Sequence, residues 1–174
     1  MTPLCDNDHV TDSWYDVAEV CLNGHTSNDS TVQFPQHNKP FCDRCGAKTI
    51  TSCPACSTPI RGGYHVPGVI GFSSSFHPPA FCYQCGADMP WTAAALNAAR
   101  LLAAETEGLT DDERDRLAGT LDDLLHDSPM TQVAASRFKR LLSTAGHGAA
   151  ESFRELLVDV VSEAAKKAIW GPGA

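Results

Sequence analysis

Seven cysteines and one histidine in the first half of the chain form four short pairs. The pairs are Cys21 with His25, Cys42 with Cys45, Cys53 with Cys56, and Cys82 with Cys85. A tight turn between the members of a pair points both donor atoms at one place. Thiolate and imidazole are the ligands of structural zinc, and four of them surround the ion tetrahedrally. The sequence therefore predicts two structural Zn²⁺ sites, with all eight side chains as ligands.

One of these motifs is repeated, since residues 41–47 read FCDRCGA and residues 81–87 read FCYQCGA. The glycine after each second cysteine provides the backbone freedom that such a turn needs. Duplication favours sequential use of the pairs, with the first two on one zinc ion and the last two on the other. Interleaved use, which joins the first pair to the third as in a RING domain, is the alternative. In the sequential arrangement Phe41 and Phe81 occupy equivalent positions beside the two metals and shield them from water.

Three features of the cysteine-rich half fall outside this pattern. In CLNGH three residues separate the ligands, and we expect the longer reach of the His25 imidazole to compensate. Cys5 and His9 repeat that spacing but have no partner pair, so we expect a flexible N-terminal thiol rather than a third zinc site. Serines 73–75 lie beside His77, but the base and orienting group that a serine nucleophile requires are not evident.

The predicted zinc sites argue against an enzyme. A catalytic zinc ion keeps one coordination position open for water or substrate, whereas each predicted site has four protein ligands. We therefore predict no catalytic residues and no bound cofactor besides the two structural zinc ions.

Charge and cysteine content restrict the partners and the compartment. The formal net charge is -8, and no stripe of lysine and arginine is present to neutralise a phosphate backbone, so nucleic-acid binding is possible but disfavoured. No apolar run approaches the ~20 residues of a membrane span, and the first residues lack the pattern of a secretory signal. We expect a cytoplasmic protein whose cysteines bind metal instead of forming disulfides.

The composition changes abruptly near residue 90, from glycine, proline and cysteine to alanine, leucine and charged residues. We expect a flexible N-terminus over residues 1–13 and a tandem zinc ribbon over residues 14–90. Residues 91–174 should form an all-α domain of about four helices. The expected fold class is thus a small metal-stabilised β structure followed by a C-terminal helical domain.

The four helices are expected over residues 92–105, 109–127, 128–146 and 149–170. Thr92 is the expected N-cap of the first helix, and Thr110 and Glu113 have the spacing of a capping box in the second. Ser128 should cap the third, with Pro129 at its first position.

Each helix has one apolar face, which should be buried in a small bundle. The expected core positions of the last three helices are Leu117, Leu121, Leu124 and Leu125; Val133, Ala134, Phe138, Leu141 and Leu142; and Phe153, Leu156, Leu157, Val160, Val161, Ala164 and Ala168. The last helix, of about 22 residues, is long for a bundle of this size. Its face is expected to join the core of its own chain, and a homodimer through the C-terminal helices is the alternative.

The pattern CLNGH…FCDRCGA…CPAC…FCYQCGA resembles the double zinc ribbon group of bacterial proteins. The fuller pattern, from WYDVAEVCLNGH through CPACSTPIRGGYHVPGV to FCYQCGADMPWT, resembles a bacterial family of unknown function. In that family a helical tail follows the ribbons, as SPMTQVAASRFKRLL and LVDVVSEAAKKAI do in this chain. The resemblance implies zinc at the eight paired residues and brings no assigned activity. His25 departs from the cysteine that is usual at its position in ribbons.

Two classes of function remain open at this point. The first is a non-enzymatic protein-interaction module, in which rigid zinc turns present loops to an unidentified protein partner. The alternative is a regulatory zinc ribbon protein that binds nucleic acid, against which the acidic charge counts.

Overall fold

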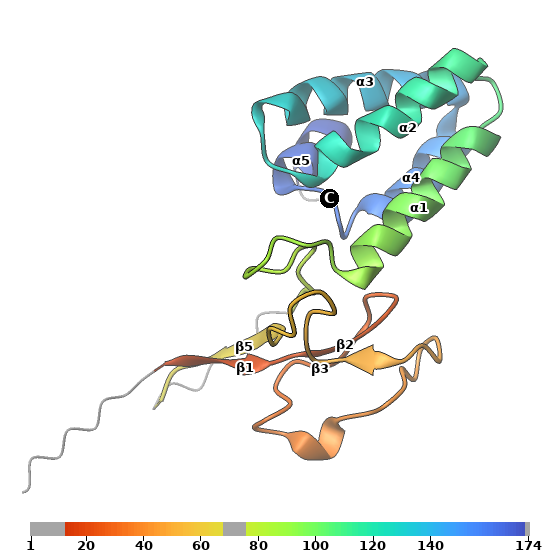
Figure 1. The fold of residues 1–174 in the computed structure, drawn as a ribbon. Coiled ribbons are helices and arrows are strands. Elements are labelled where there is room, and N and C mark those ends of the chain that lie inside the picture. The colour runs from red at the N-terminus through yellow and green to blue at the C-terminus, as the bar shows by residue number, and fades with distance from the viewer. Residues whose placement is uncertain (1–12, 68–75, 173–174) are drawn as a thin grey trace, which may run out of the picture. The chain divides into compact units, whose positions relative to one another are not determined.

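A computed structural model of the chain describes residues 13–67 and 76–172. The chain divides between residues 78 and 79 into two compact units, and each is described by itself (Figure 1). The division lies within the segment 14–90 that the sequence assigns to the tandem ribbon.

The first unit contains short strands and a single turn of 3₁₀ helix, Pro35–His37. The strands are β1 (Trp14–Val17), β2 (Glu19–Cys21), β3 (Thr26–Asn28), β4 (Thr49–Ile50) and β5 (Arg61–His65). β1 pairs with β5 in a two-stranded sheet, and β2 lies between β3 and β4 in a second sheet. All of these pairs are antiparallel. β4 lies between the second and third cysteine pairs.

In this unit, buried carboxylates accept hydrogen bonds from the backbone of other segments. The carboxylate of Asp16, 2% exposed, accepts hydrogen bonds of 3.0 Å from the backbone N–H groups of Val32 and Gln33. Glu19 accepts one of 2.8 Å from the N–H of Lys39. Among residues 13–67, the buried apolar side chains other than the cysteines are Ala18, Val20 and Ile60. A chain segment with so little apolar burial needs another source of stability.

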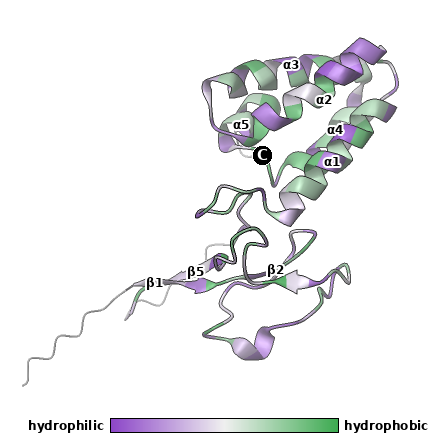
Figure 2. Ribbon diagram, viewed as in Figure 1, coloured by the Kyte–Doolittle hydropathy of each residue, from purple (hydrophilic) through white to green (hydrophobic). Residues whose placement is uncertain are grey.

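The described part of the second unit contains five helices. They are α1 (Pro90–Glu105), α2 (Asp111–Leu125), α3 (Pro129–Ala145), α4 (His147–Leu157) and α5 (Glu163–Trp170). α2 packs against α1 and α3, and α3 also packs against α4 and α5 (Figure 1). Figure 2 shows hydrophobic residues alternating with hydrophilic ones along these helices, as amphipathic helices require.

The core of the helical unit follows the predicted apolar faces closely in α2 and α3. All four predicted leucines of α2 are buried, and in α3 Phe138 packs edge-to-face on Phe153 of α4, with ring centroids 5.5 Å apart. One predicted core position is wrong, because Val133 is 40% exposed. Ala135, on the adjacent side of the same helix, is buried in its place.

Helix starts are confirmed for α2 and α3 and wrong for α1. Thr110 and Glu113 form both hydrogen bonds of the capping box, and Ser128 accepts a hydrogen bond at the start of α3. α1 begins two residues before Thr92, because Pro90 occupies the first helical position that proline favours. Thr92 is fully buried in the first turn, and its hydroxyl donates to the Ala80 carbonyl at 2.8 Å.

The single last helix predicted over residues 149–170 is wrong, since the structure has two helices with a break between Leu157 and Glu163. At the break the N–H of Ser162 donates to the carbonyl of Leu124 in α2 at 2.9 Å. The Ser162 hydroxyl then caps α5 by accepting from the N–H of Ala165. The hydrogen bond to α2 and the cap of α5 therefore interrupt the helix between Leu157 and Glu163.

The break shifts the buried face of the last segment by one residue. Ala165 and Ile169 are buried, where an unbroken helix would bury Ala164 and Ala168. The preceding apolar residues, Phe153, Leu157, Val160 and Val161, are buried as predicted, whereas Leu156 is half-buried. Most of the apolar face that suggested a homodimer is thus covered within its own chain, and the dimer stays a prediction.

Among the helices of residues 76–172, none combines the length and apolar character required to span a lipid bilayer.

Candidate metal centres

The first candidate centre lies beside the three-stranded sheet. Cys21 is the last residue of β2, and His25 precedes β3 in the connecting hairpin. Cys42 and Cys45 lie on the loop before β4, and the pairing of Cys21 with Thr49 in β4 draws this loop over the end of β2. The ligand atoms of all four residues lie within 4.8 Å of one another.

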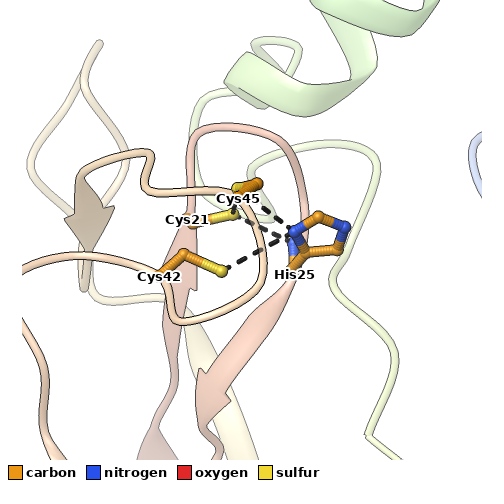
Figure 3. Close-up of side chains that lie close together, drawn as sticks. All are labelled: Cys21, His25, Cys42 and Cys45. Carbon is orange, nitrogen blue, oxygen red and sulfur yellow. Dashed lines mark hydrogen bonds between the residues drawn. The ribbon is translucent and has the colours of Figure 1, made fainter.

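The donor atoms of this centre converge on one point, as Figure 3 shows. The sulfurs of Cys21 and Cys45 are 3.7 Å apart. His25 Nδ1 is 3.3 Å from the sulfur of Cys45 and 3.7 Å from that of Cys42. The nitrogen that faces the cysteines is thus Nδ1, the ring nitrogen nearer to the backbone. The extra residue of this pair lies in a hairpin turn in which Gly24 has φ of 83°, and the compensating reach of the imidazole stays a prediction.

These distances fit the coordination shell of a zinc ion. Tetrahedral zinc with bonds of about 2.3 Å to sulfur holds two sulfurs about 3.8 Å apart. With a bond of about 2.0 Å to nitrogen, it holds sulfur and nitrogen about 3.5 Å apart. The observed distances of 3.7 Å between sulfurs and of 3.3 and 3.7 Å from sulfur to nitrogen agree with these values. Three thiol groups and an imidazole are also a donor set that zinc accepts.

A second group meets the same limit of 4.8 Å and consists of Cys53, Cys56, Cys82 and Cys85. The structure therefore brings all eight predicted residues together as two groups of four. The grouping follows the sequential order of the pairs and not the interleaved order of a RING domain. No third group of three or more such side chains occurs among residues 13–67 and 76–172.

Three of the four pairs have the same backbone conformation, which we call a knuckle. The knuckles are residues 41–48, 52–59 and 81–88, and each is closed by a single antiparallel bridge between its ends. In each, the first cysteine donates its N–H to the carbonyl five residues later, at 2.8–2.9 Å. Its own carbonyl accepts from the N–H four residues later, also at 2.8–2.9 Å.

The residue after the second cysteine has a positive φ in all three knuckles. Gly46 and Gly86 have φ of 71° and 72°, as the repeated glycine predicts. Ser57 occupies the same position in the CPAC knuckle with φ of 61°. Among the described residues it is the one non-glycine residue with positive φ, a conformation that costs an L-amino acid roughly 1–2 kcal/mol. Aligning the three motifs shows that Ser57 is equivalent to Gly46 and Gly86. The residue type alone does not indicate a positive φ there.

The knuckle backbone favours thiolates at the first centre. The backbone N–H of Ala47 lowers the pKa of Cys45. At Cys42 burial acts to raise the pKa, but the N–H groups of Arg44 and Cys45 and the His25 side chain outweigh it, so the pKa is lowered. Burial raises the pKa of Cys21. Since metals bind the thiolate, the lowered pKa values of Cys42 and Cys45 favour the metal-binding form of these two sulfurs.

Asn23 is a contributor that the sequence analysis missed. Its Nδ2 lies 3.4 Å from the sulfur of Cys45 and can donate a hydrogen bond to it. The N–H of His25 likewise donates to the sulfur of Cys21 at 3.3 Å. Hydrogen bonds of this kind orient metal ligands and stabilise their charge. The sequence feature that could have identified Asn23 is its position between the two ligands of the CLNGH motif.

The two repeated knuckles lie in different surroundings. Phe41 is 60% exposed, whereas Phe81 is half-buried and stacks on His126 with ring centroids 4.8 Å apart. Phe41 and Phe81 do take equivalent positions in their knuckles, since each closes its knuckle in the same antiparallel bridge. Their exposure differs, and the shielding of the metals stays a prediction. The residues around Phe81 pack on helices, since the indole of Trp91 donates to the Pro79 carbonyl at 3.0 Å.

Among the described residues, His65 and His77 join neither group. Cys5, His9 and serines 73–75 lie outside the described residues. His77 is exposed. His65 stacks on Trp14 and lies 3.8 Å from the carboxylate of Asp16, so it belongs to the β1–β5 sheet.

Comparison with known proteins gives one match. A model of a family described as uncharacterised proteins conserved in bacteria matches residues 14–169, which include both groups of candidate ligands and nearly all of the helical unit. No curated protein and no solved structure matches the chain.

Proposed function

The chain belongs to DUF2321, a family of uncharacterised proteins conserved in bacteria, and from this premise we propose a non-enzymatic zinc protein of the cytoplasm that binds a protein partner. Two structural zinc ions would hold a tandem ribbon, whose loops and strands present the binding surface. The observation that carries the proposal is the convergence of eight donor side chains in two groups of four.

The donor sets support a structural role for the metal. Structural zinc sites are closed by four protein ligands, and thiolate-rich sets are typical of them. The first centre offers three cysteines and a histidine, and the second offers four cysteines. The chemistry that zinc supplies in such a site is cross-linking of the chain. The residues of the knuckles contribute by orienting the sulfurs and by donating N–H groups to them.

The surface of the first unit supports a protein partner. On the β1–β5 sheet, Tyr15 and Tyr64 form a cross-strand pair with ring centroids 4.8 Å apart and exposed fractions of 53% and 57%. Trp14, on the same sheet, is 47% exposed. Exposed aromatic side chains on a rigid element are typical anchors of protein interfaces.

A nucleic-acid partner is the second candidate, and one contact favours it. The guanidinium of Arg61 lies over the ring of Tyr15, 5.1 Å from its centroid, and such arginine–aromatic surfaces also stack on nucleic-acid bases. The formal net charge of -8 opposes this function, because phosphate contacts supply most nucleic-acid affinity.

A capture experiment separates the two candidates. Metal-loaded protein is used to enrich partners from bacterial lysate with and without nuclease, in parallel with a Y15A/Y64A variant. We expect a defined protein to be enriched after nuclease treatment and to be lost from the variant. F34A, which removes an exposed aromatic outside the β1–β5 sheet, should retain that protein. Loss of the captured protein on nuclease treatment, with a steep salt dependence of binding, would favour nucleic acid instead.

A further inference from the structure

A groove of about 470 Å³ lies on the helical unit and is lined by residues of α2 and α3. Its lining residues are Arg116, Gly119, Thr120, Arg137 and Arg140. We propose that this groove binds a small ligand carrying two or more phosphate groups. The site is independent of the metal centres and of the β1–β5 sheet.

The three arginines gather positive charge on an otherwise acidic chain. Three basic side chains elsewhere on the helices form ion pairs, namely Arg100 with Asp122, Arg114 with Asp111 and Lys166 with Glu163. No ion pair to Arg137 or Arg140 occurs among the described residues. Glu113, the acid that interacts with Arg116, is engaged in the capping box of α2. The groove therefore presents three guanidinium groups that form no ion pair with the described residues.

Gly119 keeps the groove open between these arginines. It lies in the middle of α2, where glycine is less favourable than alanine. A Cβ atom built at this position would meet no atom within 4 Å, so no packing constraint requires glycine here. The φ of Gly119 is also not positive. Gly119 lines the groove, and its missing side chain leaves open space there.

The charge and size of the groove select the ligand class. A phosphate monoester carries about -1.5 to -2 at neutral pH, so three guanidinium groups are better matched by two phosphates than by one. Guanidinium groups bind phosphate oxygens bidentately. The volume of about 470 Å³ lies in the usual range of small-molecule sites.

Neighbouring residues of α3 extend the groove and add no acidic side chain to it. A second depression shares Arg137 and Arg140 and adds Gln132, Val133 and Ser136 of α3. The hydroxyl and amide groups there are neutral donors for further phosphate or hydroxyl oxygens. No aromatic side chain lines either depression, so the groove offers no stacking surface for the bases of a single strand.

The test is calorimetric titration of the full-length, metal-loaded protein with inorganic pyrophosphate at physiological ionic strength. We expect one binding site, with inorganic phosphate and citrate each binding at least about tenfold more weakly. R137Q/R140Q should weaken pyrophosphate binding by about tenfold or more for each arginine. The control K139Q/K167Q removes the same charge outside the groove and should bind as the wild type does.

A third variant tests the role of the open space. G119L fills the groove without removing charge, and we expect it to abolish binding while the thermal midpoint is unchanged or raised. The proposal is overturned if pyrophosphate does not bind, if K139Q/K167Q weakens binding as much as R137Q/R140Q does, or if citrate binds equally well. Binding of a random oligonucleotide that R137Q/R140Q abolishes, without binding of pyrophosphate, would also overturn it.

Discussion

Ser57 is the one residue of the three knuckles that replaces the glycine with positive φ. The three knuckles share their hydrogen bonds and their positive φ, yet the CPAC knuckle carries serine where the other two carry glycine. In each knuckle this backbone geometry brings the two cysteines of the pair into one candidate metal centre. The side chain of Ser57 therefore has to accept a left-handed conformation that glycine adopts at little cost.

We predict that S57G stabilises the metal-bound protein by up to about 1 kcal/mol, because it relieves this conformation. G46A, at the equivalent position of the preceding knuckle, should destabilise by about 1 kcal/mol or more. Urea unfolding of zinc-loaded protein, followed through the first unit, measures both changes. If S57G were the less stable protein, the strain assigned to Ser57 would be wrong.

His25 provides the other prediction at this scale. Because Nδ1 is the atom that faces the sulfurs, a cysteine at this position can also direct a donor atom into the centre. We expect H25C to bind two zinc ions per chain, as the wild type does, and H25A to lose the first ion at much lower chelator concentration. Competition with a chromophoric chelator gives both affinities. Equal zinc retention in H25A and wild type would exclude His25 as a ligand.

At the scale of elements, the sequence predicts helices best where the signal is local. The capping box of Thr110 and Glu113 and the leucine face of α2 follow from spacing alone. The break between α4 and α5 does not, because it depends on a hydrogen bond from Ser162 to Leu124 in another helix. Carrying the helical period across that break places the buried face one residue too early. Apolar periodicity indicates which face of a continuous helix is buried. It does not indicate where tertiary contacts break the helix and change the buried face.

For the candidate centres too, the sequence predicts the features that depend on local spacing and misses those that depend on tertiary contacts. The spacing of cysteines identifies each ligand pair, and the FCxxCGA repeat favours sequential grouping, which the structure has. The choice of Nδ1 and the hydrogen bond from Asn23 to Cys45 depend on how the β2–β3 hairpin turns. The different exposure of Phe41 and Phe81 depends on which other elements lie beside each knuckle. A repeated motif does not encode those neighbours.

The capping box of α2 predicts a pH dependence of helix stability. Hydrogen bonds from the backbone N–H and the hydroxyl of Thr110 lower the pKa of Glu113. A lowered folded-state pKa means that ionised Glu113 stabilises the fold above its unfolded pKa, ordinarily about 4.3, and that this contribution is lost as the pH falls through the folded-state value. We expect wild type to be more stable than E113Q at pH 7 and the difference to shrink towards zero near pH 3. Urea unfolding monitored by far-UV circular dichroism measures it, and a difference that is constant with pH would contradict the assignment.

At the scale of the whole molecule, the two units differ in what stabilises them. The helical unit buries leucine, phenylalanine and alanine side chains from its described helices, whereas residues 13–67 bury few apolar side chains. Structural zinc contributes about 10–16 kcal/mol of apparent binding free energy near neutral pH, which is folding free energy where no preformed site exists. The first unit should therefore depend on metal and the helices should not.

We predict that a strong zinc chelator unfolds residues 13–67 while the helices keep most of their circular dichroism. Amide hydrogen exchange resolves the two responses. Protection of the Cys21 and Gly63 amides, which donate to the carbonyls of His25 and Asp29, should be lost, and protection within α2 and α3 should remain. Adding zinc back should restore the original pattern. Retained protection of both amides in the chelated protein would show that apolar packing alone holds the first unit.

Metal content per chain tests the central claim most directly. Elemental analysis of untagged, carefully purified protein should give two zinc ions per chain, because two groups of four ligands are present. C42S/C45S and C53S/C56S should each lower that content by one ion. A wild-type value well below one metal ion per chain, in protein purified without chelator, would contradict the assignment of these cysteines as zinc ligands.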